Sequence, residues 1–160
     1  MMKQIAENIE EAFPYDVWRN RRVSADAGTL SVAEAISAAS CSVAEQIVAR
    51  VIVATTTSGY SARQIAKYRP PVPIMAVSPS EKTQRQLALV WGADCLLVPP
   101  FSQTDEMVEA TMAAVHPFPL DDADTVVITA GVPFGVSGKT NMIQVHSVGD
   151  VKMNGKADEA

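Results

Sequence analysis

Short apolar runs alternate with helical patterns along most of this chain. The runs rich in Val, Ile, Leu or Met cover 50–55, 74–77, 95–98 and 125–130. The helical patterns between them cover 61–68, 81–91 and 105–115. Continuous apolar runs are typical of strands buried on both faces, and strands joined by helices pair in parallel through right-handed crossovers. The alternation therefore predicts an α/β fold, a three-layer α/β/α sandwich.

A glycine-rich loop follows the fourth run, where another helix would continue the pattern. Residues 131–140 read GVPFGVSGKT and lead into a fifth apolar segment, 142–148. A parallel crossover needs about a dozen residues or more, so this loop favours an antiparallel neighbour. We therefore expect a five-stranded, mostly parallel sheet with an antiparallel edge strand.

Two more helices are expected before the first strand. Pro14 ends the first, over 2–13, and a capping box formed by Ser31 and Glu34 begins the second, over 31–47. Larger apolar residues of the second helix recur at spacings of three and four, which places them on one face. They are Val32, Ile36, Ala39, Val43 and Ile47. Small residues on the other face allow another helix to approach closely.

The remaining segments are polar. Residues 14–29 contain three arginines and are predicted to be an irregular surface linker. Residues 150–160 are charged and lack periodicity, so we expect a flexible tail. The domain is thus expected to cover 1–149, with the first two helices as packing or interface elements.

Composition narrows the classes of partner. Hydrophobic residues make up 48% and charged residues 19%, which is typical of a soluble globular protein. The net charge of −5 disfavours general binding to nucleic acid or to an anionic membrane. No apolar run approaches the roughly 18 residues of a membrane span, and the N-terminus lacks a signal-peptide layout. We expect a cytoplasmic protein that holds any anionic ligand by local geometry.

Residue patterns for catalysis or metal binding are sparse. Cys41, on the apolar stripe of its helix, and Cys95 have no neighbour at metal-ligand spacing and are expected to be buried thiols. The acidic run at 121–124 fits a solvated turn better than a metal site. His116 and His146 lie away from any nucleophile or acid in sequence. We expect no catalytic residue, no metal site and no cofactor in this chain.

The tripeptide Gly138-Lys139-Thr140 invites comparison with a P-loop. That motif needs a glycine five residues earlier, where Pro133 stands, and a helix afterwards, where a strand is predicted. ATP hydrolysis in this loop is therefore not expected. A glycine-rich loop with accessible amides and one Lys can still close over an anion, and a flexible hairpin end is the alternative.

The turn after the first strand has the features of an anion site. Residues 55–59 read TTTSG and lead into a helix start with Ser61 and Gln64 at capping-box spacing. A helix start presents backbone N–H groups and the positive end of the helix dipole, which favour phosphate. An ordinary βα turn is the alternative, because Ser, Thr and Gly cap many helices.

This turn and the glycine-rich loop follow the first and fourth strands. Ligands of a parallel sheet lie beyond the carboxyl ends of its strands, so both segments open at the same edge. If the two strands are close neighbours, hydroxyls, amides and Lys139 surround one space of phosphate size. That convergence favours a phosphorylated ligand.

Seven ordered blocks resemble the C-terminal domain of pyruvate kinase. They are 57–62 (TSGYSA), 66–70 (AKYRP), 73–77 (PIMAV), 85–92 (RQLALVWG), 104–107 (TDEM), 126–133 (VVITAGVP) and 138–141 (GKTN). The resemblance covers residues 2 to about 149. It implies a parent enzyme that transfers phosphate from phosphoenolpyruvate to ADP with Mg²⁺ and K⁺, in a catalytic barrel to which nothing here corresponds. This chain alone is therefore expected to lack kinase activity.

The resemblance also implies an allosteric site and subunit contacts. The site residues it implies are Thr56, Thr57, Ser58, Gly59, Tyr60 and Ser61 in the phosphate turn, with Gly135, Ser137, Gly138, Lys139 and Thr140 in a closing loop. The helix 31–47 and the strand 142–148 resemble subunit-contact elements, so a homo-oligomer is expected.

Tyr60 departs from the pattern of many members activated by fructose 1,6-bisphosphate, which carry a basic residue there. A second phosphate would lose a charge partner, which Lys139 could replace only in part. A sugar monophosphate or AMP is then at least as good a candidate effector as fructose 1,6-bisphosphate. Two further hypotheses stay open: a pure oligomerisation module, and a free-standing phosphate-binding protein or small enzyme of the same fold.

Overall fold

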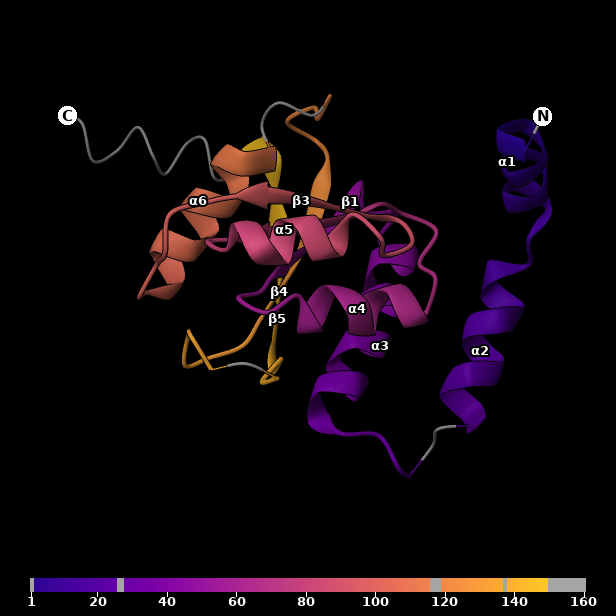
Figure 1. Cartoon of the computed structure of the whole chain (residues 1–160), viewed down its shortest axis with the longest axis horizontal. Helices are drawn as coiled ribbons and strands as arrows, with labels where there is room; N and C mark the ends of the chain where they lie inside the picture. Colours follow the sequence, from indigo (N-terminus) through magenta and orange to yellow (C-terminus); the bar gives the residue numbers. More distant parts are fainter. Residues whose placement is uncertain (1, 26–27, 116–118, 137, 150–160) are drawn as a thin grey trace.

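One five-stranded sheet in the order β3-β2-β1-β4-β5 forms the centre of the computed structural model, which describes residues 2–25, 28–115, 119–136 and 138–149 (Figure 1). The strands are β1 (Val51–Thr55), β2 (Ile74–Ser78), β3 (Ala93–Leu97), β4 (Thr125–Ala130) and β5 (Met142–Ser147). The helices are α1 (Met2–Ala12), α2 (Tyr15–Ala25), α3 (Val32–Gln46), α4 (Tyr60–Lys67), α5 (Glu81–Leu87) and α6 (Thr104–Val115). The predicted tail at 150–160 lies outside the described residues.

The strand pairing confirms the predicted sheet. β1 pairs in parallel with both β2 and β4, β2 pairs in parallel with β3, and β5 pairs antiparallel with β4 at the edge. Every residue of β1 and β2 is buried, whereas most of β3 and β5 is partly exposed. The chain leaves β1 toward β2 and returns on the other side of β1 as β4, so the strand order reverses at the β1–β4 boundary.

Alternate residues of the central strands enter two separate cores. Ile52 and Ala54 pack on the face that is covered by α3, α4 and the end of α5. Val51 and Val53 pack on the opposite face with residues of α6. Because both faces are buried, the strand shows a continuous apolar run rather than an alternating one.

The segment predicted to be an irregular linker contains helix α2, which corrects the prediction. Arg19 of α2 is only 4% exposed and forms an ion pair with Glu45 of α3. At the start of the helix, the ring of Tyr15 packs on that of Trp91 with centroids 5.8 Å apart. Figure 1 shows α1 and α2 as an arm beside the sheet. These tertiary contacts stabilise a helix whose own sequence has little apolar periodicity.

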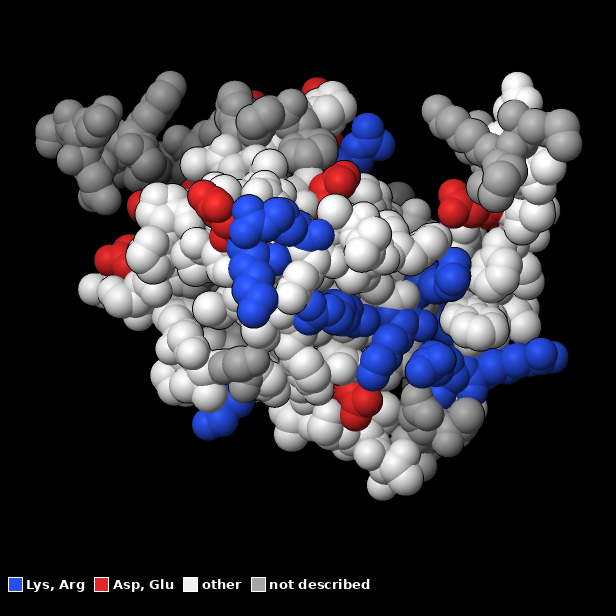
Figure 2. Space-filling model, in the orientation of Figure 1, with Lys and Arg blue, Asp and Glu red and all other residues white. Residues whose placement is uncertain are grey.

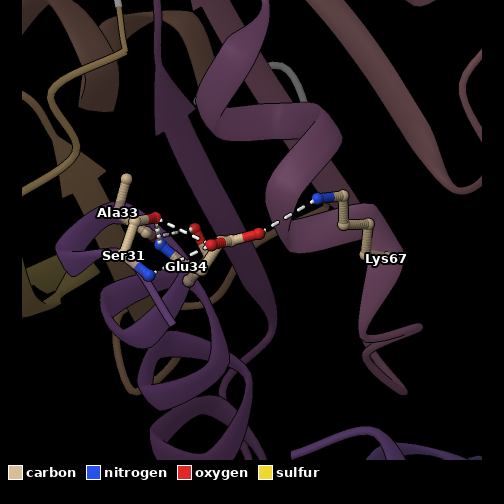
Figure 3. A network of polar contacts seen from close by, with 5 residues as sticks. Ser31, Ala33, Glu34 and Lys67 are labelled. Carbon is tan, nitrogen blue, oxygen red and sulfur yellow. Dashed lines mark hydrogen bonds and ion pairs between the residues drawn. The ribbon is translucent and has the colours of Figure 1, made fainter. Parts of the chain in front are cut away.

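Helix α3 begins at the predicted capping box. The N–H of Glu34 donates to the Ser31 hydroxyl at 3.3 Å, and the Glu34 carboxylate accepts the Ser31 N–H at 3.1 Å. Lys67, at the end of α4, approaches the same carboxylate at 3.4 Å (Figure 3). The Ser31 hydroxyl and amide, with Lys67 next, hold the pKa of Glu34 below its ordinary value. The cap thus also ties α3 to α4.

The buried face of α3 is the small-residue face, and not the stripe of larger apolar residues. Its buried residues are Ala33, Ser37, Ala38, Ser40, Cys41 and Ala44. Val32 and Ile47, on the predicted stripe, are 68% and 40% exposed. Small side chains let α3 lie close against α4 and the sheet, and the hydroxyls of Ser37 and Ser40 each donate to a carbonyl one turn earlier at 2.7 Å. Cys41 therefore belongs to the core face, which corrects its expected position on the stripe.

Helix α5 is shorter than predicted. It begins after Ser80, whose hydroxyl accepts the Thr83 N–H at 3.3 Å, as expected for a cap. It ends at Leu87, so Gly92 is not its C-terminal glycine; the Gly92 carbonyl instead accepts the N–H of Ile74 at 2.9 Å. Trp91 consequently lies beyond the helix.

Candidate functional site

A cleft of about 440 Å³ opens at the carboxyl ends of β1 and β4. This is where the strand order reverses, the usual place for a ligand in an open parallel sheet. The cleft is lined by Thr55, Thr56, Thr57, Ser58, Tyr60, Ser61, Val77, Pro79, Pro100, Phe101, Ser102, Gly131, Pro133, Phe134, Gly135, Val136, Gly138 and Lys139. Both segments singled out in the sequence therefore meet in one cavity.

Hydrogen bonds fix the turn between β1 and α4. The Thr56 hydroxyl accepts the N–H of Gly59 at 2.9 Å, which closes the turn on itself. The Thr57 carbonyl accepts the hydroxyl of Thr83 in α5 at 2.7 Å. Thr55 donates to the carbonyl of Thr129 in β4 at 3.1 Å. The turn is thus held from β4 and from α5 as well as by its own residues.

Gly59, and not Ser61, is the residue that caps α4, which corrects the predicted capping box. Gly59 has a φ of 78° in the left-handed region, and no side chain caps this helix start. A Cβ at this position would lie 3.1 Å from side-chain atoms of Arg63 and Leu87. The N–H groups of the first turn have no acceptor within the helix, and no side chain caps them. Tyr60 and Ser61 of this turn line the cleft, so their amides lie at its edge.

Arg63 is a residue of the site that the sequence reasoning missed. Its guanidinium donates to the Ser58 carbonyl at 2.9 Å and to the Gln86 side chain at 3.2 Å. It therefore fixes the phosphate turn from behind and brings positive charge next to it. Only its position in the first turn of the helix that follows the TTTSG segment could have indicated from the sequence that Arg63 lies beside this turn.

The ends of the closing loop are fastened at its base. The side chain of Asn141 accepts the Val132 N–H at 2.9 Å and donates to the Val132 carbonyl at 2.7 Å. A Cβ on Gly131 would lie 1.7 Å from the Lys139 carbonyl oxygen, so only glycine fits where the two ends of the loop pass each other. These contacts hold the two ends of the loop together, whereas Gly135, Gly138 and Lys139 between them are exposed.

Thr140 and Ser61 form a buried contact between the loop and α4. Their hydroxyl oxygens are 2.6 Å apart, and Thr140 is 1% exposed. Both belong to the predicted site, and here they join its two halves. Ser137, also predicted, lies outside the described residues. Among the lining residues that the structure describes, Lys139 is the only charged one.

An aromatic pair, also missed from the sequence, forms part of the cleft wall. Phe101 precedes α6, and Phe134 belongs to the closing loop. Their rings meet edge to face with centroids 5.0 Å apart. Each follows a proline in the sequence, which by itself gives no sign that the two residues are neighbours.

The described residues do not contain three His, Cys, Asp or Glu side chains grouped so as to hold a metal ion. Burial raises the pKa of the Cys41 thiol to about 12, which keeps it protonated and unreactive at neutral pH. Cys95 is only partly buried, and its pKa is raised for the same reason. His116 lies outside the described residues, and His146 contacts Gln144 at 3.1 Å on β5.

In the described part of the chain, no helix is long and apolar enough to cross a membrane.

The chain is similar to known pyruvate kinases over nearly its whole length. It is 38% identical to the Staphylococcus aureus enzyme over 159 residues and 36% identical to that of Clostridium acetobutylicum over 148 residues. These matches cover 97% and 92% of this chain but only 26% and 31% of the two relatives. The Lactobacillus delbrueckii subsp. bulgaricus enzyme is 43% identical over 122 residues, which are 75% of this chain and 20% of the relative.

The fold comparison gives the same assignment at the level of architecture. A solved pyruvate kinase from Cryptosporidium parvum superposes with a TM-score of 0.76 at 23% identity, over 87% of this chain and 27% of that one. The family model described as the pyruvate kinase alpha/beta domain matches residues 34–146. These residues include the phosphate turn, the closing loop and all of the sheet except the last residue of β5. The chain therefore belongs to the pyruvate kinase alpha/beta domain family.

Proposed function

We propose that this chain is a regulatory domain that binds a phosphorylated effector in the cleft between the phosphate turn and the closing loop. The observation that carries the proposal is the meeting of these two segments, which lie more than 70 residues apart in sequence, in one cavity. The turn supplies hydroxyls and the first-turn amides of α4, and the loop supplies Lys139. Amides at a helix start with one nearby cation suit a phosphate group.

The charge distribution supports an anionic ligand despite the net charge of −5. Figure 2 shows Lys and Arg side chains gathered over the face that α4 and α5 form. The cationic residues of these helices are Arg63, Lys67, Lys82 and Arg85. A local positive field raises the encounter rate with a phosphate ester and offsets the repulsion expected from the whole chain.

The catalytic step of the parent enzyme is proposed to lie elsewhere in a longer protein. That step transfers phosphate from phosphoenolpyruvate to ADP and uses Mg²⁺ and K⁺ in a barrel domain. The described residues of this chain do not group the acidic side chains that a divalent cation would need, so no step of the reaction is placed here. The proposed role of the effector is to order the closing loop and so bias contacts between subunits.

A role in self-association is the second part of the proposal. The larger apolar stripe of α3 is exposed or half-buried, with Val32 and Ile47 at its two ends. It lies near β5, which contacts α3 and has one unpaired edge in this chain. An apolar stripe beside an open strand edge favours pairing with a second copy, since pairing covers both features. A domain that associates without binding an effector is the alternative function.

Calorimetric titration tests the effector site. The 160-residue chain is titrated with ribose 5-phosphate, glucose 6-phosphate, AMP and fructose 1,6-bisphosphate. We expect at least one of them to bind, and Ser58→Ala and Lys139→Ala each to weaken that binding about tenfold, the loss expected for one charge-assisted hydrogen bond. Arg50→Ala is the matched control because Arg50 precedes β1, at the end of the sheet opposite to the cleft, and does not line the cleft.

The result that contradicts the effector site is the absence of binding by all four compounds at millimolar concentration. Sedimentation of the same samples separates the two functions. A dimer that forms equally with and without ligand favours the association role alone. A monomer at all concentrations contradicts the association role.

A further inference from the structure

Arg69 follows the end of α4 in a backbone conformation that side chains rarely adopt. Its φ is 45°, in the left-handed region, and Pro70 comes next. Helices often end in this conformation, but the residue is then usually glycine, and a following proline favours an extended backbone instead. The Arg69 N–H donates to the Ala66 carbonyl at 3.2 Å, which fixes the strained residue to the last turn of α4. Such strain persists where surrounding contacts hold it.

The contacts that hold Arg69 are aromatic. Its guanidinium lies 4.8 Å from the ring centroid of Trp91 and 5.6 Å from that of Phe13, within the range of cation–π attraction. Tyr15 completes the cluster, with its ring centroid 4.8 Å from that of Phe13 and 5.8 Å from that of Trp91. We call these four residues the arm joint. Together with the ion pair between α2 and α3, the joint fastens the α1–α2 arm to the domain.

The other end of α4 lies at the cleft. Ser61 lines the cleft, and its hydroxyl oxygen is 2.6 Å from that of Thr140 at the end of the closing loop. Helix α4 has eight residues, so its two ends are about 12 Å apart. A rigid helix of this length carries a displacement of one end to the other. The cleft and the arm joint are therefore linked by a single short element.

We propose that α4 couples the cleft to the arm, with Arg69 as the positioning residue at the arm end. This inference rests on the proposed effector site. An anion at the start of α4 attracts the first-turn amides and draws the helix toward the cleft. Arg69 moves with the helix, away from the rings of Phe13 and Trp91, and the arm joint loosens. The strained backbone of Arg69 favours this release, because it offsets part of the attraction that holds the joint.

Tryptophan fluorescence reports on the joint directly. The chain contains two tryptophans: Trp91 lies in the joint, and Trp18 of α2 packs on Phe13 with centroids 6.0 Å apart. Titration of the 160-residue chain with AMP and with glucose 6-phosphate should therefore change the emission for each compound that binds. The change should saturate with the dissociation constant that calorimetry gives for the same compound.

The affinity of an Arg69 variant separates coupling from a merely structural role. Coupling is reciprocal, so a joint that must loosen on binding opposes the ligand. Arg69→Gln removes the cation from the joint and should raise the affinity about fivefold, near the lower end of common coupling energies. It should also remove most of the emission change. Arg50→Gln, the same substitution before β1, should leave both quantities unchanged.

A test without ligand uses the cleft end of α4. Ser61→Ala removes the hydroxyl that meets Thr140 and should shift the tryptophan emission in the same direction as Arg69→Gln, although Ser61 belongs to the far end of the helix. Ser102→Ala is the matched control, because Ser102 also lines the cleft but precedes α6. It should leave the emission unchanged.

The outcomes distinguish the coupling from the effector site. Binding without a change in emission contradicts the coupling and leaves the effector site standing. An equal or lower affinity of the Arg69→Gln chain also contradicts the coupling, because it shows that Arg69 only supports the structure. If neither compound binds, the effector site is contradicted for both, and the ligand-free variants decide the coupling. Unchanged emission of Ser61→Ala, or an equal shift in Ser102→Ala, then overturns it.

Discussion

Helices α4 and α5 occupy equivalent places in the fold but begin in different ways. Each follows a buried parallel strand, and both pack on the same face of the sheet. At the start of α5 the Ser80 hydroxyl accepts a first-turn N–H, whereas at the start of α4 a left-handed glycine supplies no side-chain cap. The capped start stabilises the fold. The uncapped start leaves its amides at the cleft, where a ligand can take the place of the cap.

The substitution with the largest expected effect on stability lies in the closing loop, across the cleft from the start of α4. Gly131→Ala places a Cβ 1.7 Å from the Lys139 carbonyl oxygen, so the two ends of the loop must separate. We expect the free energy of unfolding to fall by about 3 kcal/mol, at the upper end for single substitutions. Chemical denaturation measures it. Gly135→Ala in the same loop has open space around its Cβ and should cost only about 1–2 kcal/mol, because its φ is left-handed. Equal losses in the two variants would show that the close approach at Gly131 is not a constraint.

Gly59→Ser tests the comparison directly, because it gives α4 the residue type that caps α5. A serine at an ordinary N-cap stabilises a helix, but here φ is 78° and the new Cβ would crowd Arg63. We expect the free energy of unfolding to fall by about 1–2 kcal/mol and the affinity for phosphate esters to fall as well. Thermal unfolding and calorimetry measure the two quantities. A more stable variant with unchanged affinity would mean that α4 and α5 begin in the same way in solution.

Ser80→Ala removes the side-chain cap from the start of α5, whereas Gly59→Ser introduces a capping residue type at the start of α4. The Thr83 N–H loses its acceptor, and we expect the free energy of unfolding to fall by about 1 kcal/mol. Affinity for phosphate esters should not change, since Ser80 does not line the cleft. A loss of affinity without a loss of stability would assign the anion site to α5.

The smallest expected effect on stability comes from a substitution in the capping box at the start of α3. The hydrogen bonds from Ser31 lower the pKa of Glu34 in the folded state, so the ionised carboxylate stabilises the fold above its unfolded pKa. This contribution is lost as the pH falls through the lower, folded pKa. Glu34→Gln should therefore make stability less dependent on pH below about 4.5, the ordinary pKa of a Glu carboxyl group. Denaturation midpoints between neutral and acidic pH measure the change, and parallel pH profiles for the two proteins would contradict it.

The sheet and the convergence of its two loops could be predicted from the sequence, because they depend on patterns that are local. The continuous apolar run of β1 shows that both of its faces are buried, and the short loop at 131–140 excludes a parallel crossover. The neighbouring positions of β1 and β4, stated only as a condition from the sequence, are confirmed by their pairing.

The sequence-based predictions were wrong where contacts between residues distant in sequence determine the structure. Helix α2 depends on the Arg19–Glu45 pair and on Trp91, which are distant in sequence. The periodicity of α3 places its larger apolar residues on one face, but close approach to α4 selects the face of small residues for burial. Ser61 fits a capping pattern, yet its hydroxyl meets Thr140, and only the folded chain brings Phe101 to Phe134.

We propose that the uncapped start of α4 is an anion site and that the capped start of α5 is not. The most direct measurement follows the backbone amide signals of the isotope-labelled chain by nuclear magnetic resonance during titration with inorganic phosphate and then AMP. We expect saturable shifts at Tyr60 and Ser61 and in the closing loop, with the signals of Lys82 and Thr83 nearly unchanged. Equal shifts at the two helix starts, or no shift at Tyr60 and Ser61 at millimolar ligand, would contradict it.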